Sequence, residues 1–302
     1  MNIENLKLFC QVVEQGSISQ VARTSYVTQP AVTSKIRQLE KHYGVALFDR
    51  TGGMLRVTKT GSSLYPYAKE IVGYFNRSEE VMNNISNDYE EPLHIGASLT
   101  IGEYLLPDIL GKFQKKHKQI QFSLAIGNTP TIMSKLENLE IDIALVEGIV
   151  MHRDFQIKRF AKDELILVIP RNHRWNSQKE INIEELAEER ILLREKDSGA
   201  RKIIETILAE NNVLEQIHSY IEFGSTQAIK SAVESGHGIG ILPKLSVTHE
   251  LELGVVKHLP ISNTTISRDL WIVKRPTRFP KNSINLFNHF LKEAGFNIDP
   301  SE

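Results

Sequence analysis

The sequence contains a single cysteine, Cys10, among its 302 residues. One cysteine excludes an internal disulfide framework and a zinc site of the C-x-x-C type. Cys10 falls on one helical stripe with Leu6, Phe9 and Val13, so we interpret it as a core residue rather than a redox sensor. No metal and no cofactor is expected.

The chain also lacks a long apolar run and an excess of charge of one sign. No segment approaches the ~18 apolar residues of a membrane-spanning helix. The N-terminus shows no charged region followed by an apolar core, as a secretion signal would. The net charge of −1, with 24% charged and 41% hydrophobic residues, is ordinary for a globular protein. We expect a cytoplasmic protein of two or three domains without a membrane partner.

Motifs of common enzyme classes are missing as well. The sequence has no G-x-x-x-x-G-K-[ST], no G-x-S-x-G and no H-E-x-x-H, and its ten histidines show no metal-ligand spacing. No catalytic residue is therefore expected. A cytoplasmic α/β enzyme, or a solute-binding protein with an incidental helical N-terminal domain, is the alternative function, and a DNA gel-shift distinguishes it from a regulator.

Two short helical patterns stand back to back near the N-terminus. The first runs from Ile18 to Thr24 and follows Ser17. The second begins after Thr28 as N-cap, carries Pro30 in its first turn and runs to about Tyr43. This order predicts a helix-turn-helix.

The second of these helices has one apolar and one polar face. Val32, Ile36 and Leu39 share the apolar face. The outer side carries the following polar, cationic or small residues: Pro30, Thr33, Ser34, Arg37, Gln38 and Lys41. Such a face is typical of a helix that lies in a DNA major groove. Ordinary packing of a helix pair is the alternative.

The next segment, residues 47–60, predicts a two-stranded hairpin with Gly52-Gly53 at its tip. Arg50, Arg56 and Lys59 of this hairpin are candidates for phosphate contacts. Residues 17–60 contain seven Lys or Arg and two acidic residues, a local charge of +5 in a chain of −1. A local cationic excess indicates a nucleic-acid-binding module.

The segment MNIENLKLFCQVVEQGSISQVARTSYVTQPAVTSKIRQLEKHYGVALFDR resembles the N-terminal winged helix-turn-helix domain of LysR-type transcriptional regulators. The match is close over about 65 residues, and the length and order of parts extend it to the whole chain. It implies DNA contacts by these residues: Gln29, Pro30, Thr33, Ser34 and Arg37. The tip Gly52-Gly53-Met54 departs from the basic tips of many members, so a minor-groove arginine is not expected there.

Residues 61–89 predict one long helix with a heptad seam along it. The seam residues for which we expect contacts to another chain are Ala68, Ile71, Phe75, Met82 and Ile85. One helix cannot bury such a stripe alone, and the alternative is packing on the chain's own C-terminal part. The resemblance implies that the helix pairs with its twin, in a homodimer or homotetramer.

Beyond Glu90-Glu91-Pro92 the pattern alternates between strands and helices, which predicts parallel sheets covered by helices. It includes a helix over 102–117 and two separate strands, FQIKRFA and ELILVIP. The resemblance implies a periplasmic-binding-protein-like effector domain of two α/β subdomains. The expected ranges are 1–60 for the DNA-binding domain, 61–89 for the linker helix, and 92–302 for the effector domain, with subdomain I at 92–161 and 266–302 and subdomain II at 162–265.

Small hydroxyl residues recur where strands end and helices begin, and ligands of open α/β sheets bind at that edge. The candidate effector residues are Ser98, Thr100, Ile101, Thr129, Glu147, Ser198, Ser225 and Thr226. Each Ser or Thr has the alternative of a simple N-cap. Converging helix N-termini bind anions. For Glu147 the two expected roles are to order the site or to bind a cationic group. For Arg194 and Arg201 the alternatives are pairing with a ligand oxyanion and forming surface salt bridges.

These patterns predict a DNA-binding regulator, and the resemblance implies a LysR-type transcription factor that binds an interrupted palindrome and responds to a small metabolite. Its expected partners are double-stranded promoter DNA, a small effector (an anion in our interpretation) and RNA polymerase. Residues 96–107, GASLTIGEYLLP, resemble the subset of these regulators that controls assimilation of inorganic sulfur or carbon.

Overall fold

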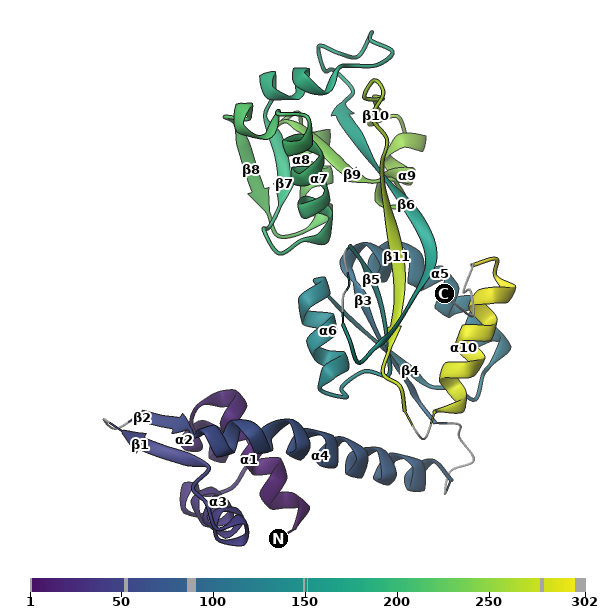
Figure 1. The fold of residues 1–302 in the computed structure, drawn as a ribbon. Coiled ribbons are helices and arrows are strands. Elements are labelled where there is room, and N and C mark those ends of the chain that lie inside the picture. The colour runs from purple at the N-terminus through teal and green to yellow at the C-terminus, as the bar shows by residue number, and fades with distance from the viewer. Residues whose placement is uncertain are drawn as a thin grey trace. The chain divides into compact units, whose positions relative to one another are not determined.

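The computed structural model describes residues 2–51, 54–85, 91–148, 150, 152–277 and 280–296. Its contacts divide the chain into two compact units, Met1–Tyr89 and Glu90–Glu302 (Figure 1). In the described ranges no helix combines the length and apolar character needed to cross a membrane.

The first unit is mostly helical. Its elements are α1 (Ile3–Gln15), α2 (Ile18–Thr24), α3 (Gln29–Tyr43), β1 (Phe48–Thr51), β2 (Met54–Val57) and α4 (Lys59–Ile85). The Ser17 hydroxyl accepts the Gln20 amide at 3.2 Å, and the Thr28 hydroxyl accepts the Ala31 amide at 3.3 Å. Both predicted N-caps are therefore confirmed, and with them the helix-turn-helix of α2 and α3.

The core of this unit lies between α1, α2, α3 and the first turns of α4. Its fully buried members include Leu6, Phe9, Val21, Val32, Leu39 and Ala68. Cys10 belongs to the same core, and burial together with the nearby Glu14 carboxylate raises the pKa of its thiol to about 12. The interpretation of Cys10 as a core residue is confirmed.

The wing is an antiparallel pair of β1 and β2, with Phe48 opposite Val57. Glu40 on α3 positions its base, because the Glu40 carboxylate accepts the amides of Leu47 at 2.8 Å and Phe48 at 3.2 Å. The predicted hairpin is confirmed in its strands, whereas its tip, Gly52-Gly53, lies outside the described residues.

The second unit is built on one mixed sheet. Its strands are β3 (Leu93–Ser98), β4 (Phe122–Gly127), β5 (Ile143–Glu147), β6 (Gln156–Pro170), β7 (Ile191–Arg194), β8 (Tyr220–Phe223), β9 (Ile239–Pro243), β10 (Val256–His258) and β11 (Ile266–Lys274). They lie in the order β4-β3-β5-β11-β6-β9-β7-β8, with β10 paired to β6. The helices are α5 (Leu106–Lys116), α6 (Thr129–Glu137), α7 (Gly199–Glu210), α8 (Thr226–Glu234), α9 (Lys244–Glu252) and α10 (Asn282–Glu293), with 3₁₀ turns at Ile183–Glu188 and Leu214–Gln216.

Two long strands run through both halves of this unit (Figure 1). β6 is a single strand of 15 residues, so the expectation of two separate strands is wrong. It pairs with β11 over Gln156–Leu165, and this ladder continues through the polar residues Lys162, Asp163 and Glu164, at which the sequence pattern predicted a break. Phe160 packs in the core with β3, α5 and α10, whereas Leu165 and Ile266 pack in the core with β7 and α7. Subdomain I therefore resumes beyond residue 266 on β11.

The segment expected as one helix over 102–117 is divided. Ile101–Leu105 forms a π-helical turn, and α5 follows from Leu106 with Pro107 in its first turn. Proline has no amide hydrogen to donate to the preceding turn, which favours a new helix start at this point.

Candidate DNA interface and effector site

The outer face of α3 forms a shallow hollow of about 520 Å³. It is lined by Gln29, Pro30, Thr33, Ser34, Arg37, Gln38 and Lys41. The structure thus brings the six expected DNA contacts of this helix together on one surface. Val32, Ile36 and Leu39 face the core instead, as their spacing predicts. The Thr33 hydroxyl donates to the Gln29 carbonyl at 3.0 Å, so it is committed within the helix.

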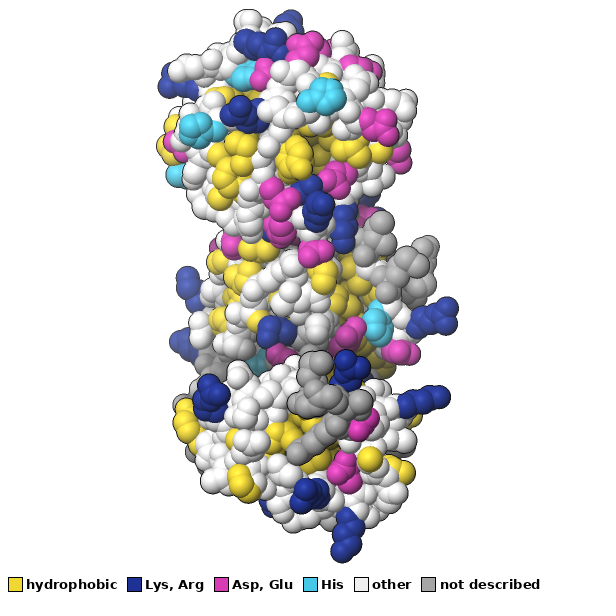
Figure 2. All heavy atoms as spheres, turned by 90° about the vertical axis from the view of Figure 1, so that its left-hand side faces the viewer, with side chains coloured by type: hydrophobic (Ala, Val, Ile, Leu, Met, Phe, Trp, Pro, Cys, Tyr) yellow, Lys and Arg dark blue, Asp and Glu magenta, His cyan; other side chains and the backbone are white. Residues whose placement is uncertain are grey.

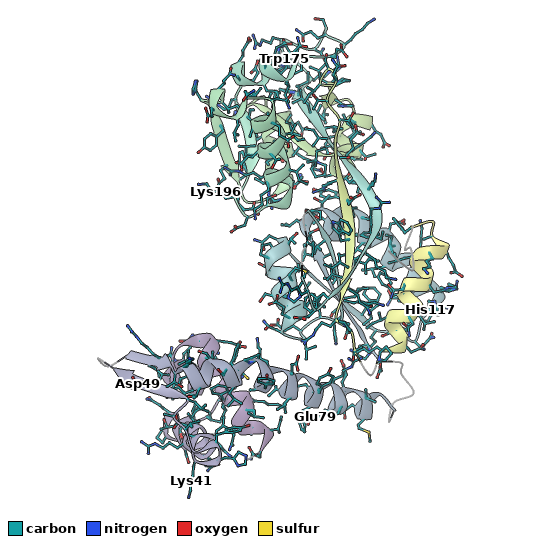
Figure 3. The ribbon with its side chains drawn as sticks, viewed as in Figure 1. Lys41, Asp49, Glu79, His117, Trp175 and Lys196 are labelled. Atoms are coloured by element: carbon teal, nitrogen blue, oxygen red, sulfur yellow. The ribbon has the colours of Figure 1, made fainter. Side chains whose placement is uncertain are left out.

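Six cations of α2, α3, β2 and the start of α4 are available to a polyanion. Within the described residues, no ion pair involves Arg23, Lys35, Arg37, Lys41, Arg56 or Lys59. Figure 2 shows Lys and Arg side chains projecting from the surface, and Figure 3 shows Lys41 extending away from α3. Unpaired surface cations lose little on meeting phosphates and release counterions when they do.

The wing contributes fewer defined contacts. Arg56 on β2 and Lys59 at the start of α4 are exposed. The side chain of Arg50, also expected at phosphates, lies outside the described residues, and so do the side chains at 51 and 54. Asp49, labelled in Figure 3, stands on β1 of the same hairpin.

In the second unit, Ser98 and Glu147 meet at the carboxyl ends of the neighbouring strands β3 and β5. The Ser98 hydroxyl donates to the Glu147 carboxylate, and both residues are buried. The Thr129 hydroxyl, at the start of α6, donates to the Glu147 carbonyl at 3.1 Å. Three of the expected effector residues therefore form one hydrogen-bonded group, and in this group Glu147 is the acceptor.

The remaining hydroxyls are distributed differently. Ser198 and Ser225 cap α7 and α8, accepting the amides of Arg201 at 3.5 Å and Ala228 at 3.2 Å. Thr226 accepts from Arg194 at 3.1 Å. Thr100 is buried and makes no capping hydrogen bond through its side chain.

The structure corrects the assignment of Ile101 to the effector site. Its side chain is fully buried in the core that includes Leu106 and Phe113, because the π-helical turn directs it inward. It packs with the core instead of facing a ligand.

Arg194 and Arg201 are held by carboxylates of their own subdomain. Arg194 pairs with both oxygens of Glu195 at 2.7 Å. Arg201 pairs with Glu205 at 2.7 Å and Glu222 at 2.5 Å, and it donates to the Arg194 carbonyl. The sequence left two alternatives for Arg194 and Arg201, a ligand oxyanion or salt bridges, and in the structure both residues form salt bridges.

The buried charged residues that were not predicted from the sequence include Asp163 on β6 and Arg268 on β11. Arg268 donates to Asp163 at 2.7 and 3.0 Å and lies 3.4 Å from the Glu147 carboxylate. Its Nη1 makes no hydrogen bond in the described structure. Strand alternation was the available signal, because Arg268 shares the inward face with Ile266 and Leu270.

The two subdomains approach each other beside Glu147. A Cβ placed on Gly199, the first residue of α7, would lie 3.3 Å from the Glu147 carbonyl oxygen. Farther along, the Tyr104 hydroxyl donates to the Gln227 side chain at 3.3 Å, and the Lys230 ammonium lies 4.8 Å from the Tyr104 ring centre. The strand end of one subdomain thus faces a helix N-terminus of the other. In the described part of the chain, no group of three His, Cys, Asp or Glu residues is placed to hold a metal ion.

The seam expected on α4 does not lie on a single exposed face. Ala68 is fully buried in the core of its own unit, and Phe75 lies under the Lys7 ammonium at 5.0 Å. Assigning Ala68 to contacts with a partner chain is therefore wrong, since its side chain is enclosed in the core of its own unit. Phe75 is partly exposed, and its contact with a partner chain stays a prediction. Ile71 and Met82 are exposed, and the side chain of Ile85 lies outside the described residues.

Comparison with known proteins places both units in one family. Residues 3–62 match the model "Bacterial regulatory helix-turn-helix protein, lysR family", and residues 86–295 match "LysR substrate binding domain". The chain is 31% identical to a probable RuBisCO transcriptional regulator of Cyanophora paradoxa, over 95% of this chain and 90% of that protein. It is 30% identical to the HTH-type transcriptional regulator CysL of Bacillus subtilis (strain 168), over 97% of each. The expected resemblance to regulators of this subset is confirmed.

A solved structure shows the same fold in the second unit. The regulatory domain of Synechocystis PCC6803 CcmR, in complex with 2-PG, superposes with a TM-score of 0.61 at 25% identity, over 67% of this chain and 96% of that one. The winged helix-turn-helix, the two-subdomain α/β unit and both family matches agree. The chain therefore belongs to the LysR family of transcriptional regulators.

Proposed function

We propose that this regulator binds an interrupted palindrome in promoter DNA as a homodimer or homotetramer, with α3 in the major groove. Gln29, Pro30 and Ser34 then contact base edges, while Arg37, Lys41 and the wing residues Arg50, Arg56 and Lys59 contact phosphates. The observation that carries this proposal is the outer face of α3, where the described cations have no acidic partner. Phosphate contacts set affinity and base-edge contacts set specificity.

The exposed residues of α4 supply the surface for a second copy. Tyr67, Ile71, Tyr74 and Met82 are between 43% and 68% exposed and recur at spacings of four, three and eight residues. These spacings place them on one side of the helix. A second α4 that covers this stripe holds two recognition helices at a fixed distance, and the second half-site then gains from effective concentration.

The effector in this proposal is a small anion bound between the subdomains. Three observations support this. The N-terminus of α7 lies beside Glu147, and the Thr100 hydroxyl makes no capping hydrogen bond. The related regulatory domain was solved in complex with 2-PG. Helix N-termini carry a partial positive charge and free amides, which favour anions. RNA polymerase is the further macromolecular partner we infer, together with a cytoplasmic location and no catalytic activity, in keeping with a family of regulators.

Gln29 and Arg37 provide the test of the DNA interface. A Gln amide in the first turn of α3 pairs with a base edge, a contact of roughly 1–3 kcal/mol. We expect Gln29→Ala to weaken binding to a duplex selected by the wild-type protein from a random pool, and to leave binding to random DNA nearly unchanged. Arg37→Ala should weaken both and lower the salt dependence by about one counterion. Fluorescence anisotropy at several salt concentrations measures these effects.

The matched control is Arg174→Ala, which removes an exposed cation of the second unit that pairs with Glu188 and Glu189. It should leave DNA binding unchanged. Equal losses on selected and random DNA for Gln29→Ala would remove this residue from base readout.

A further inference from the structure

Tyr26 occupies an unusual place in the first unit. It lies in the turn between α2 and α3, and its side chain is 96% exposed. Its φ of +55° lies in the left-handed region. Its hydroxyl has no hydrogen-bond partner in the described part of the chain.

Stability of the fold does not account for a tyrosine at this position. A side chain with a Cβ is disfavoured in the left-handed region, where Gly and Asn are tolerated best. Two of the other non-glycine residues with positive φ in the described chain are asparagines, Asn212 and Asn263. The turn is closed by backbone groups, since the Val27 amide donates to the Ala22 carbonyl at 3.0 Å. The exposed ring adds no burial that would offset the strain.

The location and charge of the turn indicate what the side chain contacts. In a helix-turn-helix bound to DNA, the first helix crosses the sugar-phosphate backbone while the start of the second reads bases. The connecting turn therefore lies over the backbone, and tyrosine hydroxyls are among the groups that bind phosphate oxygens. Residues 17–39 carry Arg23, Lys35 and Arg37 and no acidic residue. Arg23, in the last turn of α2, is exposed and forms no ion pair in the described structure.

We propose that Tyr26 is a DNA-backbone contact: its phenol hydroxyl donates a hydrogen bond to a phosphate oxygen beside the bases that α3 reads. The inference rests on the proposed placement of α3 in the major groove. In this role Tyr26 contributes to DNA affinity and to the register of α3 on the DNA, and it does not contribute to discrimination between bases.

The test uses the full-length protein and a duplex selected from a random pool by the wild type. Tyr26→Phe deletes the hydroxyl and keeps the ring, and we expect it to lower affinity about three- to tenfold, the loss of one hydrogen bond, on selected and random duplexes alike. Tyr26→Asn relieves the backbone strain and removes the ring, so it should melt at the same or a higher temperature and still lose affinity. Tyr220→Phe, at a 55% exposed tyrosine of the second unit, is the control and should bind as the wild type does.

Methylphosphonate substitution identifies the phosphate. Replacing one phosphate at a time removes its charge and an acceptor oxygen, and at the phosphate bound by Tyr26 the loss should not add to that of Tyr26→Phe. Wild-type affinity in Tyr26→Asn, or additive losses at every phosphate, would overturn the inference while the DNA interface of α3 stands. A wild-type protein that selects no duplex would overturn the proposed interface, and this inference with it.

Discussion

At the scale of single residues, the second unit is distinguished by buried charge where its long strands β6 and β11 pair. Arg268 is fully enclosed and neutralises Asp163, while its third nitrogen faces Glu147. Glu147 in turn accepts from Ser98. A charge taken out of water is costly unless partners replace the water, so each member of this group depends on the others. The group joins β11 and β6 to the end of β5, at the candidate effector site.

Arg268→Met should therefore destabilise the second unit by about 3–5 kcal/mol, because it leaves two buried carboxylates without their cation. Both tryptophans, Trp175 and Trp271, lie in this unit, so urea unfolding followed by tryptophan fluorescence measures its stability separately.

Arg174→Met is the comparison. Since Arg174 is half-exposed in its ion pairs, this substitution should lower the free energy of unfolding by about 0–1 kcal/mol. Adding Asp163→Asn to Arg268→Met should recover part of the loss, because one uncompensated charge disappears. A similar cost for Arg268→Met and Arg174→Met would show that the buried group does not hold the strands.

At the scale of elements, the two sides of α4 have different environments. One side packs on α1 through Ala68 and Val72, and it is fastened by the pair Lys69–Glu14 at 2.7 Å. The other side carries Tyr67, Ile71 and Tyr74 outward. Exposing apolar side chains at these spacings to water is unfavourable, so such a stripe favours association with another helix.

Ile71→Glu and Phe75→Glu should consequently have different effects, although they lie four residues apart. Ile71→Glu places a charge on the outward stripe and should yield monomers with nearly unchanged thermal unfolding. Phe75→Glu removes a ring that lies under Lys7 and should lower the stability of the first unit by about 1–3 kcal/mol. Light scattering after size exclusion, with calorimetry on the same samples, measures both. An unchanged mass for Ile71→Glu would place the dimer contacts elsewhere.

At the scale of the whole molecule, a bound effector changes DNA binding only if its affinity differs between two arrangements of the subdomains. The strands β6 and β11 connect the two subdomains, and the contacts between the subdomains include the hydrogen bond from the Tyr104 hydroxyl to the Gln227 side chain. A ligand that touches both sides therefore favours the arrangement in which these contacts form.

Thr100→Val tests this arrangement, because it keeps the volume and deletes a hydroxyl that caps no helix. Sulfate, phosphate and 2-phosphoglycolate are compared first by thermal shift of the wild-type protein. For the anion with the largest shift, we expect Thr100→Val to lower affinity by about 1 kcal/mol, or roughly fivefold, without changing DNA binding in its absence. Calorimetry that shows wild-type affinity in both Thr100→Val and Ser98→Ala would reject this location.

Local patterns determined the helix-turn-helix, the wing and the alternation of strands and helices. Caps such as Ser17 and Thr28, and the spacing of Val32, Ile36 and Leu39, act within a few residues and can be read from the chain. The outer face of α3 follows from the same periodicity, so its residues were predictable as a set. Their contacts with bases and phosphates remain predictions.

Only the tertiary structure decided which side of α4 is covered, because Ala68 and Ile71 are both apolar and the packing of α1 selects between them. It also decided that β6 is one strand, since pairing with β11 continues across the polar residues in its middle. The group of Ser98, Glu147 and Arg268 could not be read from the sequence for the same physical reason: Arg268 and its partner Asp163 are 105 residues apart, and no local spacing connects them.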